Sequence, residues 1–425
     1  MDKITKEEIL LLRELASQVA EIAAHPGQEK RRNQWKALNG LREKRRPMVW
    51  IDQICWHEMN VNDELTIVTL HPVCRDFEDI LRKILYRHRH MQGDQVVEPY
   101  LEVPMVLHGY TTGYVDWQES FDFGIKVQDE VVKTDLANDI VSHNYLVQIK
   151  DERDIEKIKM PQVSYDKKGS QEKLAFVQEI FGDSIPVRLR GCHPAFKLWD
   201  MLLQWCGIEN LLLDMAMRPE YLHALAGRLT DAYLSGLDQL ESLGVLGGAD
   251  SLIHCTGAYS DELKPTENNV KAKDMWTLNL CQIFSSVSKE MHEEFEATYS
   301  GKWYGRFGLG YYGCCEPLHD RIDMIRKIPH IRKISTSAWA DRKIAAEAMK
   351  GDFVLSFKPN PSVLAQGQFD LAMARKDLQE TIDICEKTGT PVELILKDLS
   401  TVRYQPQRLW EWSKMAAELT GGEII

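Results

Sequence analysis

Two short stretches of the chain place sulfur and imidazole side chains next to each other. "GLGYYGCCEPLHD", which begins at Gly308, holds two adjacent cysteines after an apolar aromatic run, and "LIHCTG" ends a second apolar run with a histidine and a cysteine. Thiolates and imidazoles bind zinc, and a thiolate is also a nucleophile. We therefore predict a metal or thiolate site. Its candidate ligands are His254, Cys255, Cys314 and Cys315.

Further polar side chains follow other apolar runs. His57 and Glu58 come after "MVWIDQIC" and could act as acid and base or line a polar mouth. Tyr312, just before the cysteine pair, is a third catalytic candidate that could also wall an aromatic pocket. His193 follows "IPVRLRGC", where it could instead bond a carbonyl group in a turn. The candidates for substrate binding are Trp56, Arg190, His193, Lys358 and Asn360.

Strand and helix patterns alternate along most of the chain. A β-favouring run that ends near Ile54 is followed by seven further strand candidates, with amphipathic helices between them. The later strands are predicted at 97–107, 184–193, 248–257, 303–314, 330–337, 353–361 and 392–400, and helices at 196–206, 218–243, 274–299, 317–328, 341–350, 369–388 and 405–419.

Eight strands alternating with helices predict a parallel sheet closed into a (β/α)8 TIM barrel, with an open doubly wound sheet as the alternative. Residues 1–46 are predicted to form a helical cap, and 47–425 the barrel, with a loop-rich excursion at about 109–182. The carboxyl ends of barrel strands meet at one open face, where catalytic groups gather. Five of the nine cysteines fall at these predicted ends, whereas packing cysteines should favour strand interiors and helix faces.

Arg188 and Arg190 lie two residues apart on one predicted strand and so project to the same side. Two guanidinium groups inside a barrel need counter-charges. Acidic residues such as Glu98 or Glu102 could pair with them, or they could anchor an anionic substrate.

The composition restricts the class of protein. The chain has 425 residues, of which 44% are hydrophobic and 27% charged, as in ordinary globular proteins. The net charge of −12 argues against nucleic acid or an anionic membrane as a partner, and the basic stretch 29–47 is interpreted as a solvated helix face. No apolar run is long enough for a bilayer and the amino-terminal helix is too charged for a signal peptide, so we expect a cytoplasmic protein.

Several segments, in this order, resemble the uroporphyrinogen decarboxylase superfamily over roughly residues 45–420. They are "VSHNYLVQIKDERDIEKIKMPQVSYD", "IPVRLRGCHPAFKLW" with "DMAMRPEYLHALAGRLTDAYL", "YYGCCEP", and "FKPNPSVL". The resemblance implies a (β/α)8 barrel, in agreement with the strand count. The superfamily contains the haem-pathway decarboxylase and methyltransferases that serve corrinoid proteins, and its members often form homodimers.

The resemblance favours the methyltransferase branch. The decarboxylases carry an arginine-rich loop after the first strand, and here that loop, "WIDQICWHEM", has no arginine. The methyltransferases hold zinc with a His-x-Cys pair after strand five and a cysteine after strand eight. Cys314 matches the cysteine of the pair, but Tyr312 stands at the histidine position, and strand eight offers Lys397 and Asp398. The resemblance therefore implies zinc only if His254, Cys255, Cys315 or Glu316 supplies the missing ligands.

The leading interpretation is a methyltransferase that moves a methyl group, with metal assistance, between a small methylated substrate and a corrinoid (cobalamin) carried by a partner protein. A decarboxylase or lyase acting on a small carboxylic acid, with Arg188 and Arg190 as anchors, is the alternative. A non-catalytic binding protein on a degenerate barrel is the third possibility.

Overall fold

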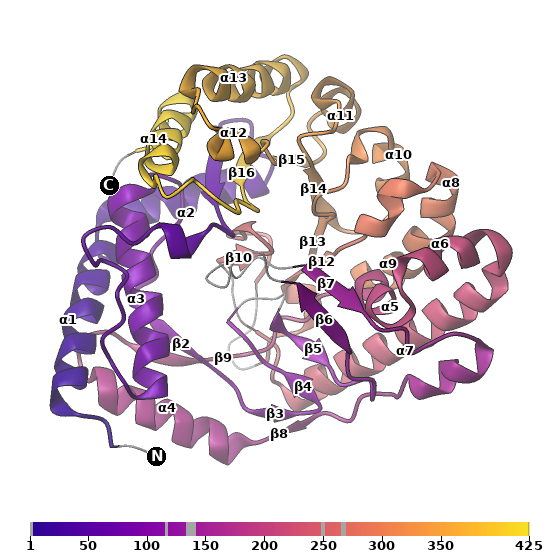
Figure 1. The fold of residues 1–425 in the computed structure, drawn as a ribbon, viewed down its shortest axis with the longest axis horizontal. Helices are drawn as coiled ribbons and strands as arrows, with labels where there is room; N and C mark the ends of the chain where they lie inside the picture. Colours follow the sequence, from indigo (N-terminus) through magenta and orange to yellow (C-terminus); the bar gives the residue numbers. More distant parts are fainter. Residues whose placement is uncertain (1–2, 115–117, 133–141, 248–250, 265–268, 424) are drawn as a thin grey trace.

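The computed structural model describes residues 3–114, 118–132, 142–247, 251–264, 269–423 and 425. Helices form an outer layer around centrally placed strands, and the amino-terminal helices lie beside the carboxyl-terminal helix α14 (Figure 1). The helices are α1 (Lys6–Ala23), α2 (Pro26–Asn39), α3 (Pro72–His90), α4 (Lys167–Phe181), α5 (Leu198–Cys206), α6 (Ile208–Met217), α7 (Pro219–Leu243), α8 (Lys289–His292), α9 (Thr298–Tyr304), α10 (Ile322–Ile325), α11 (Arg342–Met349), α12 (Ser362–Ala365), α13 (Leu371–Thr388) and α14 (Gln407–Thr420).

The central element is a parallel sheet of six strands, in the order β1-β16-β15-β14-β13-β12. The pairing of β1 with β16 joins the first strand of the chain to the last. The strands are short and mostly buried on both faces, as expected where helices cover a parallel sheet. They are β1 (Met48–Ile51), β12 (Trp276–Asn279), β13 (Leu309–Tyr312), β14 (Ile331–Thr336), β15 (Val354–Phe357) and β16 (Val392–Leu396).

A second parallel pair consists of β2 (Leu101–Pro104) and β9 (Val187–Arg190). Single parallel bridges continue from it, Cys192 with Leu246 and Phe196 with Asn279, so this pair follows on toward β12. The predicted α/β class is confirmed. A closed ring of eight hydrogen-bonded strands is not seen among the residues that the structure describes.

Three small antiparallel pairs occupy the segment between β2 and α4. They are β3 (Leu107–His108) with β8 (Ser164–Tyr165), β4 (Tyr110–Thr111) with β5 (Ser120–Phe121), and β6 (Asp129–Val132) with β7 (Ser142–Tyr145). A 3-10 helix at Glu152–Lys157 follows β7. Within the described part of the chain, every helix is too short or too polar to cross a membrane.

Several elements differ from the sequence prediction, among them α4, which lies in the predicted loop-rich excursion. Residues 252–257, predicted within a parallel strand, form an antiparallel hairpin of β10 (Leu252–Ile253) and β11 (Thr256–Gly257). The parallel strand is instead β12, which the sequence placed at the start of a helix. The short apolar run "WTLN" fits either element by periodicity. A tight turn with His254 in the left-handed region, at φ 52°, folds the hairpin back on itself.

Hydrogen bonds and an ion pair hold this hairpin inside the sheet. Lys333 Nζ lies 2.7 Å from Glu393 Oε2, and both side chains are fully buried. Thr256 Oγ1 donates to the same Glu393 oxygen at 2.7 Å, and Lys333 donates to the carbonyl oxygen of Gly257 at 2.9 Å. Asn39, from α2, donates to the Gly257 carbonyl from the other side at 3.0 Å. The hairpin is thus fixed to β14, β16 and the amino-terminal helices.

Glu393→Gln should destabilise the protein by about 3–5 kcal/mol, because it leaves the Lys333 ammonium buried without its counter-charge. Chemical denaturation of the two proteins measures this difference. The matched control is Glu418→Gln, which breaks a half-exposed pair with Arg375 at 2.9 Å and should change stability by less than about 1 kcal/mol. Equal effects of the two substitutions would contradict the anchoring role.

Candidate active site

Cys314 lies immediately after β13, where the chain turns sharply. Gly313 adopts a φ of 82°, and a side chain there would collide with Leu318, so the turn requires glycine. The turn brings the Cys314 side chain to the face of β13 that Tyr311 occupies, within an apolar cluster that also contains Ile253 of the hairpin. Cys314 is almost completely buried, with 4% of its surface exposed.

Three nitrogen-bearing side chains surround Cys314. His254 Nε2 lies 3.3 Å from its sulfur, and Lys397 Nζ donates to the same sulfur at 3.2 Å. Lys358 Nζ donates to the Cys314 carbonyl oxygen and, at 2.6 Å, to Ser335 Oγ. Lys358 and Lys397 are themselves buried. The predicted meeting of His254 and Cys314 is therefore present.

Strand alternation places these lysines. Lys397 directly follows β16, four residues after Glu393, and Lys358 directly follows β15, two residues after Ser356, so each pair shares a face if the alternation continues by one residue. The first member of each pair belongs to the layer around the buried ion pair, since Ser356 donates to Glu393. The second member reaches the next layer, which contains Cys314.

Cys315 connects this buried sulfur to the surface. Its sulfur lies 3.5 Å from that of Cys314 and 3.3 Å from Asp398 Oδ2, to which it donates. Cys315 is exposed, and Asp398 lines a large cavity. Contacts through Cys315 and Asp398 thus link the Cys314 sulfur to the cavity.

The surroundings favour the thiolate form of Cys314. Contact with the Cys315 sulfur, together with the charges of Lys358, His254 and Lys397, holds the pKa of Cys314 well below its usual value despite burial. Burial alone would lower the pKa of His254, but its interactions with the Cys255 and Cys314 sulfurs raise it to about 10. Burial opposes the charged form of Lys397 as well, and the Cys314 thiolate raises its pKa in spite of this. The group is therefore an ion cluster around one sulfur.

The residues present do not fit the zinc site that the sequence predicted. Among the described residues, no group of three or more His, Cys, Asp and Glu side chains is arranged to hold a metal ion. The Lys397 ammonium, which cannot ligate a metal, donates directly to the Cys314 sulfur. Cys255 lies 3.9 Å from the Tyr311 hydroxyl, and Cys315 donates to Asp398. No chemical step is therefore derived through zinc.

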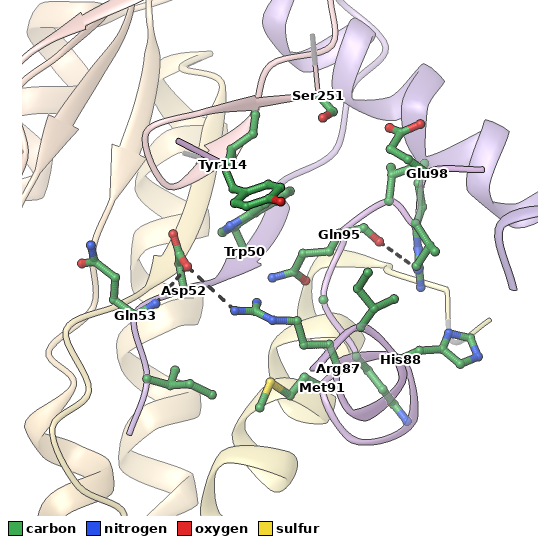
Figure 2. A pocket seen from close by; sticks show the side chains of 18 of the residues that line it. Trp50, Asp52, Gln53, Arg87, His88, Met91, Gln95, Glu98, Tyr114 and Ser251 are labelled. Carbon is green, nitrogen blue, oxygen red and sulfur yellow. Dashed lines mark hydrogen bonds and ion pairs between the residues drawn. The ribbon is translucent and has the colours of Figure 1, made fainter. Parts of the chain in front are cut away.

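A cavity of about 860 Å³ lies between β1, α3 and the segment that leads into β2. Trp50 and Asp52 project into it from β1 and its carboxyl end, Arg87 from α3, and Tyr114 from the segment after β4 (Figure 2). Arg87 lies 3.8 Å from Asp52 and donates to the carbonyl oxygen of Ile51. Aromatic walls with a few charged groups are typical of a small-molecule site.

Among the residues that the sequence singled out for substrate binding, Trp56 lines this cavity. Arg87 and Lys83 lie 5.1 Å and 5.3 Å from the centre of its ring. His57 and Glu58 belong to a different network. Glu58 is buried and accepts hydrogen bonds from Thr401 Oγ1 at 2.6 Å and from two backbone N–H groups of the loop after β16. Glu58 therefore joins the loop after β1 to the loop after β16.

Tyr312 points away from Cys314. Its hydroxyl donates to Glu296 and lies 2.8 Å from His292 Nε2, both on the helical segments that cover the sheet. The reason is strand alternation: Tyr311 faces inward, Tyr312 faces the helices, and the turn at Gly313 returns Cys314 to the inner face. Tyr311, rather than Tyr312, is the tyrosine of the site.

The remaining candidates have structural partners. His193 Nε2 lies 2.9 Å from the Trp276 carbonyl oxygen, the alternative anticipated for a turn. Arg190 lies 3.5 Å from Glu102, which also binds Arg188 at 2.8 Å. Both arginines of this strand are therefore paired with an acidic residue. Asn360 accepts a hydrogen bond from the backbone of Ser362 within its own loop.

Sequence reasoning assigned no role to several residues that matter here. Lys397 and Asp398 were recognisable only as polar residues after a strand, and the alternation from Glu393 was the available signal for Lys397. Asp200, near the start of α5, escaped notice; burial and the charges of Glu316 and Cys314 raise its pKa to about 7. Asp52, Arg87 and Tyr114 carry no local pattern that marks them.

Fold and site together describe an α/β protein with a thiol centre at the carboxyl end of a parallel sheet. No family model matches the chain, and no curated protein matches it. Among solved structures, it is similar to a methyltransferase from Methanosarcina mazei, with a TM-score of 0.52, 10% sequence identity, and coverage of 91% of this chain and 98% of that chain. At this identity, the likeness shows a shared fold.

Alkylation measures the state of Cys314. The iodoacetamide reaction of the Cys314 peptide should keep its rate as the pH falls from 9, the ordinary thiol pKa, to about 7, because the thiolate persists below that ordinary value. Lys397→Met should make the rate fall with pH. Cys315 in a Cys314→Ala protein serves as the reference thiol. A wild-type rate that drops about tenfold per pH unit over this range would contradict the charge cluster.

Proposed function

We propose that this protein is a methyltransferase that moves a methyl group between a small methylated compound and a corrinoid carried by a partner protein. The observation that carries the proposal is the buried Cys314 sulfur, in contact with His254 and Lys397 and linked through Cys315 to Asp398, which lines the 860 Å³ cavity. The fold shared with a methyltransferase, and the superfamily segments of the sequence, support it.

The site offers what a methyl displacement needs. The methyl carbon must lie in line between the attacking and leaving atoms, so the donor has to be held with its methyl group exposed on one side. Trp50 and Tyr114 would enclose an apolar methylated group, and Asp52 and Arg87 would orient polar groups of the same molecule. Lys397 and Lys358, which lie around Cys314 and not among the residues that line the cavity, would stabilise negative charge that develops at the Cys314 end of the site.

The corrinoid is a substrate in this proposal. Its cobalt, in the reduced state, is the nucleophile that takes a methyl group, and methylated cobalt is the donor in the opposite direction. The partner would present it at the carboxyl ends of the strands, where Asp398 lines the cavity and contacts the exposed Cys315.

The alternative of a carboxy-lyase receives less support. Its proposed anchors, Arg188 and Arg190, are paired with Glu102 along β9 and β2, and neither lines the cavity. A carboxylate substrate would have to displace Glu102 to reach them.

An anaerobic transfer assay tests the proposal. The protein is mixed with cob(I)alamin and separate pools of methylamines, methyl thioethers and methoxylated aromatic compounds, and methylcobalamin formation is followed by absorbance. At least one pool should be demethylated. Cys314→Ala should lower the rate by about two orders of magnitude, because the site loses its charged sulfur. Cys385→Ala, a buried thiol in α13, is the matched control and should leave the rate unchanged.

Failure of every pool, with the corrinoid-binding fraction of the source cells added as carrier, would contradict a methyltransferase. Demethylation that proceeds equally well in Cys314→Ala would support a methyltransferase activity but would show that its active site does not include Cys314.

A further inference from the structure

We infer that Cys314 itself carries the methyl group during transfer: its thiolate accepts the methyl group from the donor and then passes it to the acceptor. The inference rests on the proposed function, because it names the covalent step within the same site. It replaces the metal-held thiol that the sequence led us to expect with a sulfur of the chain, stabilised by ammonium groups.

The charges around the sulfur are the first argument. Lys397 donates to it at 3.2 Å and His254 lies 3.3 Å away, both buried. The acceptors of Lys358 are neutral oxygens, the Cys314 carbonyl and Ser335 Oγ, while Lys397 also lies 3.6 Å from the half-exposed Asp398. Buried ammonium groups require a nearby anion. A thiolate at Cys314 is the anion in direct contact with this group.

The buried carboxylate of Glu316 has a structural role in the turn after β13. Glu316 accepts hydrogen bonds from the backbone N–H groups of Cys281, at 3.0 Å, and Cys314. It thereby holds the turn after β13 and keeps the Cys314 side chain directed at Lys397. The arrangement fixes one sulfur in a cationic environment, which is how proteins activate a nucleophilic cysteine.

The transfer consists of two displacements. In the first, a lone pair of the Cys314 sulfur attacks the methyl carbon, a sulfur–carbon bond forms, and the donor's bond to that carbon breaks with its electron pair leaving on the donor. When methylcobalamin is the donor, the leaving group is cob(I)alamin. In the second, the acceptor's lone pair attacks the same carbon, and the sulfur–carbon bond breaks with its pair returning to sulfur. Each step conserves electrons without an external oxidant or reductant.

The same charges favour departure of the methyl group. S-methylation converts the thiolate into a neutral thioether and leaves the Lys397 ammonium and the imidazole of His254 without the anion that they contact, with Lys358 buried in the same layer. Loss of the methyl group restores that anion. The cluster therefore stabilises the thiolate both as the nucleophile of the first step and as the leaving group of the second. A transient methyl carrier requires both roles.

Access is the remaining requirement. Cys315 contacts the Cys314 sulfur at 3.5 Å and, at 3.3 Å, the carboxylate of Asp398, which lines the cavity. Rotation of this one exposed side chain would uncover the buried sulfur.

Single-turnover labelling tests the inference. The full-length protein is mixed anaerobically with an equimolar amount of methylcobalamin carrying a 13C-methyl group, quenched, digested and analysed by mass spectrometry. The Cys314 peptide should gain the labelled methyl group, with one cob(I)alamin released per label. Cys314→Ser should show no label. Lys397→Met should label at least tenfold more slowly, Lys397→Arg should recover most of the rate, and Cys385→Ala should match the wild type.

Each outcome has one meaning. If the protein transfers methyl groups in the multi-turnover assay but Cys314 stays unlabelled, the carrier role is overturned and the proposed function stands. Label on Cys315 instead overturns the assignment to Cys314. Absence of both label and turnover overturns both proposals. Equal labelling rates in Lys397→Met and wild type, with both proteins folded by circular dichroism, overturn the role of the ammonium groups.

Discussion

The buried ion pair between Lys333 and Glu393 is the interaction on which the candidate site depends. It lies in the middle of the parallel sheet, and Glu393 also accepts hydrogen bonds from Thr256 and Ser356. A buried pair of this kind contributes little net stability compared with apolar packing, but its directional bonds select one arrangement of the groups that they join. Here they hold a short hairpin against the parallel sheet. In the described part of the chain, the strands of this hairpin pair only with each other and not with the strands of the sheet.

The hairpin in turn completes the surroundings of Cys314. Two residues before Thr256, the tight turn sets His254 against the Cys314 sulfur, while Lys397, the residue after the strand that carries Glu393, donates to the same sulfur. Burial raises the cost of every unpaired charge in this layer, so the thiolate, the imidazole and the ammonium groups depend on one another. The stability of the layer around Lys333 and Glu393 is therefore coupled, through β16 and the hairpin, to the chemistry of the layer around Cys314.

The sequence alone predicts the class of fold and part of the site. Alternating strands and helices predicted a parallel α/β structure, and the clustering of cysteine and histidine after strands predicted the approach of His254 to Cys314. The identity of single elements was less accessible, since "WTLN" is too short to distinguish a buried strand from a helix by periodicity. Orientation also escaped prediction at Tyr312, because the glycine turn after it reverses the face on which the next side chain lies. The cavity residues Asp52, Arg87 and Tyr114 come from separate segments and meet only in the folded chain.

Amide hydrogen exchange of residues 252–257 in the wild type and in Thr256→Val tests the central dependence most directly. The substitution keeps the shape of the side chain and removes the hydroxyl that donates to Glu393. The predicted result is faster exchange at His254 and Cys255 with unchanged protection of β13–β16. Exchange in the hairpin identical to the wild type would contradict the claim that this buried network holds the hairpin against Cys314.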